Sequence, residues 1–370
     1  MSAIAAPVAK RAVRPGRELN PSKRAAREPF WDNVRFVAIA LVVVGHSVEK
    51  LADSDLMAAL YFVIYAFHMP LFAFVCGRFA SATAGRPGSA AKLLTQLVVP
   101  YLLFSAVWFA LRLVVEGTAR FDPATSYSHL WFLVALLVWR LVLPMIAALR
   151  YPVLISLAVS VAAGYVHGVG SEFDSGRIVG MLPFFVLGWA LKERGLPRWV
   201  ESRLGASLLV KVTAAALLVG ACVLAYLQIE QVRELGLRKW AQMEGNYVDL
   251  GMPEWWAGFV RVGMLALAVL LAAAVLALVP RGPGRLSDWG QATMYVYMLH
   301  RIPLYLLWKT TDFVPWVDSA PRFALVITLA VLLTVVLSTQ PVRRLFRPVV
   351  EPRLHWLLAP GARPREGAAT

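Results

Sequence analysis

The chain has 370 residues, of which 59% are hydrophobic and only 16% are charged, and its mean hydropathy is +0.63. This balance excludes an ordinary soluble domain. The formal net charge of +15 does not indicate nucleic-acid binding, because the basic residues lie in the tails and in short segments between apolar stretches. The two cysteines, Cys76 and Cys222, lie inside apolar stretches without disulfide or zinc-ligand spacing.

The first segment, residues 1–29, is rich in Ala, Pro and Arg and has no periodic apolar face, which predicts a disordered basic tail. It lacks the short apolar core and small-residue cleavage site of a secretory signal, so we expect the first helix to act as an uncleaved anchor. We predict a membrane domain over residues 30–345 and a second tail over residues 346–370.

Apolar stretches then recur along the chain, and a bilayer requires about 20 apolar residues per helix. We therefore predict an all-α integral membrane protein with about ten transmembrane helices in one bundle. The fifth and sixth are short and interrupted by Gly or Pro, so counts of nine and eleven stay open. The expected spans are 34–52, 56–80, 93–115, 129–148, 151–168, 177–192, 208–228, 257–280, 289–308 and 322–342.

With ten spans, the basic loops and both tails fall on one side, which the positive-inside rule assigns to the cytoplasm. We expect a multi-pass protein of the plasma (inner) membrane with both termini cytoplasmic. The opposite loops carry aromatic residues that fit either an interfacial belt or a sugar-stacking surface: Trp240, Tyr247, Trp255, Trp256 and Trp316. No internal repeat is visible, which disfavours a transporter.

Within the first span, Arg35 and His46 flank an almost wholly apolar run. Their spacing of eleven residues places them on one helix face, about 16 Å apart along the axis. Ionisable residues in a span are costly and indicate a functional site. The alternative is structural: Arg35 lies near the helix end, where it snorkels to phosphates or pairs with Asp32.

Other polar residues in the spans have the same two interpretations. His68 either lines a cavity or caps a carbonyl freed by Pro70. His129 and Trp131 either stack on a sugar ring or anchor the fourth span at the interface. His300 and Arg301 lie deeper in their span, which favours a functional role. Arg140 is the most central of the span arginines.

These segments together resemble the acyltransferase-3 family of membrane-bound acyltransferases. The resemblance rests on the Arg, ten residues and His of the first span, on FHMPLFAFVCGRF (67–79), HLWFL (129–133) and LPFFVLG (182–188), and on YVYMLH (295–300). It covers about residues 30–345. The opening WDNVRFVAIALVVVGH (31–46) is most similar to the fucose 4-O-acetylase-like branch. One departure from the family pattern is Cys76 before Gly77, with Arg78 after it where an aromatic is common.

The resemblance implies transfer of an acyl group, expected to be acetyl, from cytoplasmic acyl-CoA to a hydroxyl of a carbohydrate or glycoconjugate. Acetyl-CoA is then a donor substrate, with no permanently bound cofactor and no metal. We expect His46 to be the catalytic base or to carry a transient acyl group, and Arg35 to position the donor. Expected donor contacts are Arg78 and Arg140; expected acceptor contacts are Asp32, His68, His129, Trp131 and His300.

Two alternatives stay open at the sequence level. The same chemistry could act on an antibiotic, a lipid or another non-sugar acceptor, and a transporter or flippase of a glycan or lipid-linked sugar could also use intramembrane His and Arg. Motifs of embedded hydrolases, P-loop ATPases, zinc proteases and Rossmann enzymes are absent from the sequence. The expected partners are acyl-CoA, the acceptor and the lipid bilayer, without nucleic acid, and the sequence does not indicate an oligomeric state.

Overall fold

A computed structural model describes residues 28–82, 89–121, 129–170, 172–195 and 207–352. These residues form helices, turns and loops without a strand, which confirms the all-α prediction for the described part. Most of the predicted N-terminal tail lies outside these ranges. The longer helices are α1 (Pro29–Val48), α2 (Asp55–Arg78), α4 (Val99–Glu116), α5 (Trp131–Ala147), α6 (Pro152–Ala163), α7 (Ser175–Arg194), α9 (Leu208–Leu227), α12 (Ala257–Leu278), α15 (Arg301–Thr310), α17 (Ala320–Leu337) and α18 (Gln340–Val350).

Short helical elements connect them. A π-helical turn, η2 (Leu94–Val98), joins α3 (Ser89–Leu93) to α4. The remaining elements are η1 (Glu49–Leu51), η3 (Glu172–Asp174), α10 (Ile229–Glu234), α11 (Leu237–Ala241), α13 (Arg285–Gly290), α14 (Thr293–Leu299) and α16 (Phe313–Trp316). The last helix, α18, runs through residue 345, where we had expected the membrane domain to end.

Five helices in the described ranges are long and apolar enough to cross a membrane: Asp55–Arg78, Ala90–Glu116, Leu208–Leu227, Ala257–Leu278 and Ala320–Leu337. Two shorter apolar helices, α5 and α6, fall below the length of a full span. Each of the ten expected spans overlaps a helix of the structure, but a count of ten membrane crossings is not established by these lengths. The five long apolar helices support a protein that crosses the membrane several times.

The ninth expected span, residues 289–308, is divided into α14 and α15. The break follows from Pro303, which has no N–H to bond the carbonyl of Leu299 four residues earlier and whose ring crowds that carbonyl. His300 lies at the junction and is fully buried. Instead of lying on one continuous helix, His300 and Arg301 are therefore presented where the chain changes direction.

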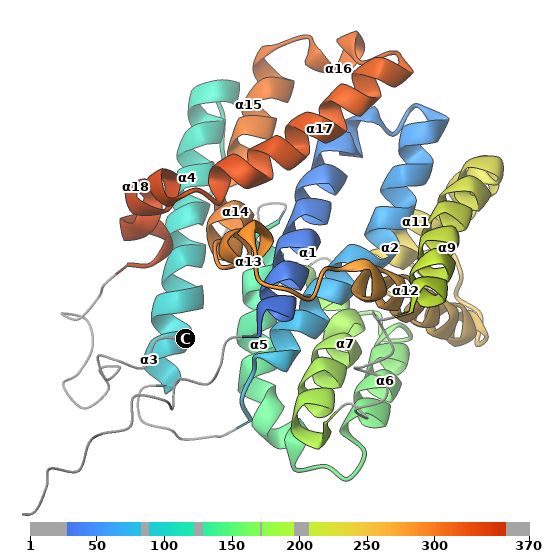
Figure 1. The fold of residues 1–370 in the computed structure, drawn as a ribbon. Helices are drawn as coiled ribbons and strands as arrows, with labels where there is room; N and C mark the ends of the chain where they lie inside the picture. The colour runs from blue at the N-terminus through green and yellow to red at the C-terminus, as the bar shows by residue number, and fades with distance from the viewer. Residues whose placement is uncertain (1–27, 83–88, 122–128, 171, 196–206, 353–370) are drawn as a thin grey trace, which may run out of the picture.

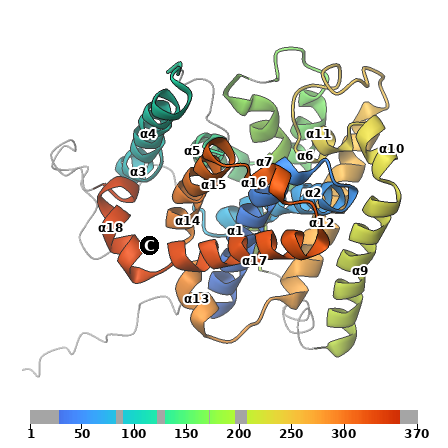
Figure 2. The same ribbon diagram turned by 90° about the horizontal axis from the view of Figure 1, so that it is seen from above.

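Helix α1 lies in the middle of the fold, between α2, α13 and α17 (Figures 1 and 2). Its apolar run is almost fully enclosed, since Val34, Ile39, Val43 and Val48 are all 0% exposed. In both views α17 crosses over α1 rather than running beside it, and α4 stands at the edge next to α18. Of the polar residues of α1, Asp32, Asn33 and Ser47 are buried in protein, whereas Arg35 and His46 are partly exposed.

Glycines bring α2 and α7 into very close contact. A Cβ atom on Gly77 would lie 1.9 Å from the carbonyl oxygen of Phe185, and one on Gly188 would lie 2.0 Å from that of Phe74. Both distances are far shorter than any tolerated contact, so only glycine allows these backbones to approach. This pair of helices fixes two walls of the cavity described below.

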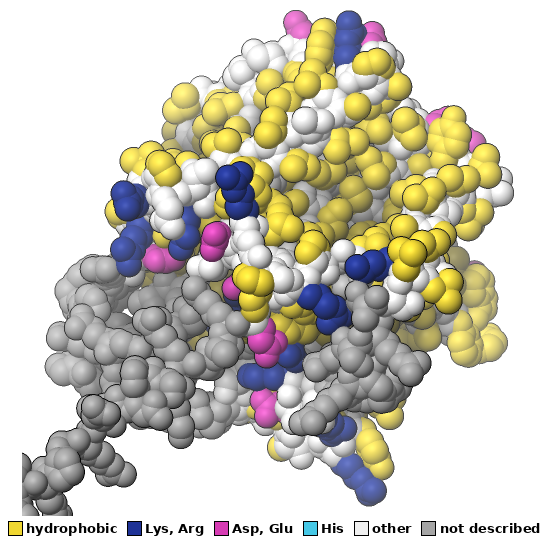
Figure 3. Space-filling view, in the orientation of Figure 1, with side chains coloured by type: hydrophobic (Ala, Val, Ile, Leu, Met, Phe, Trp, Pro, Cys, Tyr) yellow, Lys and Arg dark blue, Asp and Glu magenta, His cyan; other side chains and the backbone are white. Residues whose placement is uncertain are grey.

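The surface is apolar over broad areas. Hydrophobic side chains cover much of the face seen in Figure 3. The exposed fractions of Val114, Leu208 and Phe259 are 83%, 76% and 70%. Apolar patches of this kind are rare on soluble monomers and are the expected surface of helices in lipid.

Candidate active site

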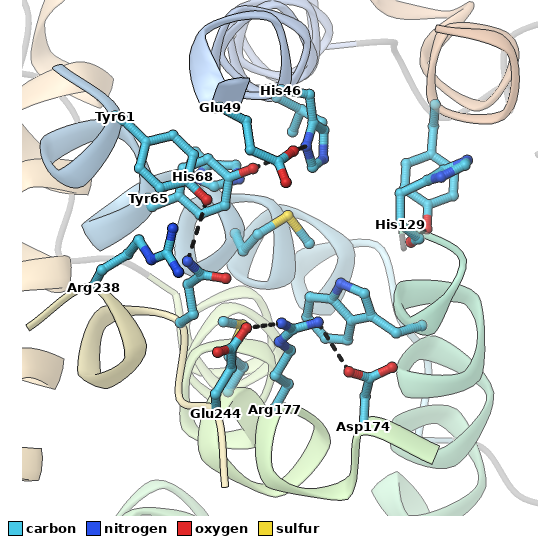
Figure 4. Close-up of a pocket in the computed structure, with 16 residues that line it drawn as sticks. His46, Glu49, Tyr61, Tyr65, His68, His129, Asp174, Arg177, Arg238 and Glu244 are labelled. Atoms are coloured by element: carbon cyan, nitrogen blue, oxygen red, sulfur yellow. Dashed lines mark hydrogen bonds and ion pairs between the residues drawn. The ribbon is translucent and has the colours of Figure 1, made fainter. Parts of the chain in front are cut away.

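A cavity of about 250 Å³ lies beside His46 (Figure 4). Its walls come from α1, α2, α7, α11 and α14, from the start of α5 and from the segment after α11. Most of the lining is polar or aromatic, which is unusual inside so apolar a protein. The lining residues are Val42, His46, Glu49, Tyr61, Tyr65, His68, Met69, His129, Trp131, Asp174, Arg177, Met181, Arg238, Gln242, Glu244 and Tyr297.

The Nδ1 atom of His46 has three polar neighbours. It lies 2.9 Å from the Tyr65 hydroxyl, 2.9 Å from Nη1 of Arg301 and 3.3 Å from Oε2 of Glu49. Nη1 of Arg301 also donates to the same Glu49 oxygen at 2.7 Å. Nε2 of His46 has no hydrogen-bond partner among the described residues, which leaves this atom for a ligand in the cavity.

The proton on His46 can therefore take two positions. If Nδ1 carries it, that N–H donates to Glu49 and Nε2 presents a lone pair. If Nε2 carries it, Nδ1 accepts from Tyr65 and Arg301. Only the first arrangement makes Nε2 a base. The Glu49 carboxylate favours it, whereas the Arg301 guanidinium, which can only donate, favours the second.

Gly45 permits the contact between Tyr65 and His46. A Cβ atom at position 45 would lie 3.1 Å from the Tyr65 ring and 3.2 Å from the side chain of Ile64. Glycine thus lets α2 approach α1 beside His46, close enough for the phenol to reach Nδ1. Gly45 therefore lets α2 approach α1 directly beside the functional side chain of His46.

A group of buried histidines continues from His46 into the protein. The ring of His300 stacks on that of His46 at a centroid distance of 5.4 Å, and His129 meets His300 edge-on at 5.3 Å. Nδ1 of His300 donates to the carbonyl of Val296 at 2.9 Å, so its Nε2 is the free acceptor. This Nε2 and both ring nitrogens of His129 are buried without a hydrogen-bond partner among the described residues.

His68 lies on the α2 wall, and its Nδ1 donates to the carbonyl of Ile64 at 2.8 Å. The carbonyl that Pro70 leaves unbonded is that of Ala66, four residues before it. His68 therefore does not cap the carbonyl freed by Pro70, which was one of the two sequence interpretations. The other interpretation fits its position, because its side chain lines the cavity.

Across the cavity from His46, Arg177 lies between two carboxylates (Figure 4). It pairs with Asp174 at 2.9 Å and with Glu244, and its guanidinium carbon lies 5.5 Å from the centre of a Trp131 ring. On another wall, Arg238 lies over the Tyr61 ring at 5.8 Å. Charged groups and aromatic faces thus alternate around the opening.

Arg35 lies at the other end of α1 and does not line the cavity. It pairs with Asp32 at 3.1 Å, and its guanidinium carbon lies 3.7 Å from the centre of the Phe79 ring. Arg78 lies over the Trp31 ring at 4.4 Å and pairs with Glu28 at 3.3 Å.

Arg140 belongs to the same end of the fold. Arg35 and Arg140 both lie within electrostatic range of Cys76 in the last turns of α2, and Nε of Arg140 is buried without a hydrogen-bond partner among the described residues. Three of the predicted cationic residues therefore gather near the first turns of α1 and the last turns of α2.

The sequence model of the acyltransferase-3 family, described as an acyltransferase domain, matches residues 28–339. The chain belongs to this family. No curated protein and no solved structure matches the chain. Membership confirms the family resemblance and makes this protein an acyltransferase, and the apolar helices make it a membrane protein. The fucose 4-O-acetylase-like branch stays a prediction.

The acyltransferase fold thus separates the predicted site residues into two groups. Around the cavity it gathers His46, His68, His129 and Trp131, with His300 stacked behind His46. At the opposite end of α1 it gathers Asp32, Arg35, Arg78 and Arg140.

Several residues in or beside the cavity of this acyltransferase were not among the predicted site residues. Glu49 follows His46 by three positions and so shares its helix face, a signal that could have identified it. Arg301 contacts His46 without lining the cavity; the sequence favoured a functional role for it together with His300 but assigned it no specific contact. Arg177 and Glu244 carry no local signal, because their pairing spans 67 residues.

Proposed function

We propose that this acyltransferase moves an acetyl group from acetyl-CoA to a hydroxyl of a carbohydrate or glycoconjugate, with His46 as the general base. The observation that carries the proposal is the free Nε2 of His46, which faces a polar and aromatic cavity while Nδ1 lies 3.3 Å from the Glu49 carboxylate, an acceptor for Nδ1–H. A base must lie within reach of the proton that it removes, and this nitrogen is open to the cavity.

The reaction requires two proton transfers, one from the acceptor hydroxyl and one to the departing thiolate. Nε2 of His46 removes the hydroxyl proton as the acceptor oxygen attacks the thioester carbonyl carbon. The C–S bond then breaks, and the proton passes from His46 to the departing thiolate. Glu49 holds Nδ1–H throughout and stabilises the positive charge that develops on the imidazole ring.

The cavity supports a small sugar acceptor. Its volume of about 250 Å³ lies just below the range of about 300–1,000 Å³ that drug-sized ligands occupy, so a sugar ring and a short acyl group are better matched to it than a long acyl chain. Trp131, Tyr61 and Tyr297 offer aromatic faces, and Arg177, Gln242 and Glu244 offer hydrogen-bonding groups. The lining therefore provides aromatic faces beside hydroxyl-binding groups.

We further propose that the donor approaches from the opposite end of α1. Arg35, Arg78 and Arg140 supply positive charge there, and CoA carries phosphates that arginine binds well. Arg35 lies about 16 Å from His46 along the helix, so it contacts a remote part of the donor while the thioester reaches the cavity. In this proposal ten spans place both termini and the donor on the cytoplasmic side of the plasma membrane.

The test uses membranes that contain the wild type or a variant, incubated with acetyl-CoA labelled in the acetyl group. Label is then measured in the glycan, lipid and small-molecule fractions. We expect His46→Ala to lower incorporation by about 10²- to 10⁴-fold. The matched control is His167→Ala, which removes an exposed histidine outside the cavity and should behave as wild type.

The fraction in which the label is found distinguishes a wrong acceptor from a wrong catalytic residue. Label in the lipid or small-molecule fraction instead of the glycan fraction would reassign the acceptor and leave the role of His46 in place. Unchanged incorporation in His46→Ala would contradict that role. Arg35→Met should raise the KM for acetyl-CoA and leave the acceptor KM unchanged; a rise confined to the acceptor would contradict donor positioning.

A further inference from the structure

Arg261 is a buried cation that the proposed chemistry does not use. It lies in the second turn of α12 and is 2% exposed. Within the described ranges no carboxylate lies within 4.0 Å of it, although thirteen other pairs with an acidic group occur there. Burying a charge without a counterion is costly, so its surroundings must compensate by other means.

The compensation comes from residues 237–252, here called the cap segment. The guanidinium carbon lies 5.4 Å from the centre of the Tyr247 ring and 5.9 Å from that of Trp240, and Nη1 donates to the sulfur of Met243 at 2.8 Å. Trp240 and Tyr247 are almost fully buried, at 0% and 1% exposed. Two aromatic faces and a polarisable sulfur thus surround the cation.

Helix α7 leaves room for this arrangement. A Cβ atom on Gly180 would lie 2.7 Å from the side chain of Met243 and 3.1 Å from Nη1 of Arg261, and one on Gly176 would lie 2.8 Å from the backbone nitrogen of Gly245. Met243 has a φ of +56°, a left-handed conformation that is costly for a side chain without the local hydrogen bond of Asn or Asp. The cap segment is therefore held in one defined and strained conformation against α7 and α12.

The residues on either side of Met243 line the cavity. Glu244 pairs with Arg177, which lies over Trp131, and the Gln242 side chain donates to the Tyr61 hydroxyl at 3.4 Å. A shift of Met243 would move both neighbours and would release Arg177 from one of its carboxylates. The cage around Arg261 thus connects α12 to the cavity wall opposite His46.

We propose that Arg261 is a positioning residue that fixes the cap segment and so sets the shape of the acceptor side of the cavity. It touches neither acceptor nor donor and acts through Met243 on Gln242 and Glu244. The assignment of this wall to the acceptor rests on the proposed function; the control of the cap segment by Arg261 does not.

The first experiment measures hydrogen exchange of the full-length protein in detergent or nanodiscs. Arg261→Met removes the charge at similar length, and we expect amides 240–247 to exchange about tenfold faster or more, with other helices unchanged. Arg261→Lys keeps a cation over the rings and should restore part of the protection. The control is Lys211→Met, which removes an exposed cation from α9.

A second variant covers the case in which Arg261→Met unfolds the whole chain. Met243→Leu keeps the volume and removes the sulfur acceptor, so exchange should rise only in the cap segment. The proposal is overturned if the cap segment exchanges as in wild type in Arg261→Met, or if Arg261→Met unfolds the chain and Met243→Leu leaves the cap protected.

The kinetic readout distinguishes positioning from a general loss of stability. Arg261→Met should raise the acceptor KM by about tenfold or more while the KM for acetyl-CoA stays within twofold of wild type. The reason is that a displaced cavity wall weakens the binding of the acceptor only. Equal changes in both constants would overturn the proposal. If the wild type transfers no label while the cap segment responds to Arg261→Met, the acceptor assignment fails and the control of the cap segment stands.

Discussion

Glu49→Gln tests whether the carboxylate beside His46 determines which ring nitrogen is the base. The substitution keeps the shape of the side chain and removes its charge, so Nδ1–H loses a charged acceptor at 3.3 Å and Arg301 loses one charged partner at 2.7 Å. A hydrogen bond to a charged group contributes about 1.5–3 kcal/mol. Because about 1.4 kcal/mol corresponds to a factor of ten, we expect kcat/KM to fall by about 10- to 150-fold.

The assay is initial-rate transfer of labelled acetyl by purified protein at fixed acceptor, with thermal unfolding measured on the same samples. The matched control is Glu230→Gln, since Glu230 is an exposed carboxylate of α10 whose side chain is 68% exposed and pairs with Arg233. An exposed ion pair contributes little to stability, so the loss of the Glu230–Arg233 pair should leave the transfer rate within twofold of wild type. A wild-type rate in Glu49→Gln, with His46→Ala inactive, would refute the assigned role of Glu49.

Three further predictions concern packing and topology. Gly188→Ala should lower the unfolding temperature, because its Cβ would lie 2.0 Å from the carbonyl oxygen of Phe74, whereas Gly220→Ala on α9, where a Cβ meets nothing within 4 Å, should leave it unchanged or raise it. Gly45→Val should push Tyr65 away from His46 and lower the transfer rate, with helical content in circular dichroism unchanged. A reporter fused to the C-terminus should report the cytoplasm; an external signal would contradict an even number of spans.

Hydropathy predicted the helices well because each apolar run is a local property of the chain. Nine of the ten expected spans coincide with a helix or with the continuous pair η2 and α4. The exception, residues 289–308, was predicted as one helix because its average composition is apolar, although Pro303 carried the signal for a break. The number of true membrane crossings is harder to predict, because short apolar helices such as α5 and α6 are compatible with burial in protein or in lipid.

The cavity was only partly predictable for a different reason. His46, His68, His129 and Trp131 stand out in sequence because polar residues are rare in apolar runs. Arg177 and Glu244 lie at helix ends and in a loop, where charge is ordinary, and only the fold brings them together. A charged residue in a loop becomes informative only when a structure shows which cavity it lines.

The two ends of α1 explain why one helix carries both Arg35 and His46. A rigid helix keeps them about 16 Å apart on one face, and α2, α13 and α17 pack around that helix. The arginines at one end are suited to an anionic donor, and the sugar-sized polar cavity at the other is suited to a hydroxyl acceptor. In the proposed mechanism, the two substrates bind from opposite ends, and a long donor delivers only its small acyl group to His46. Residues at the Arg35 end should therefore change the donor KM, and residues of the cap segment the acceptor KM.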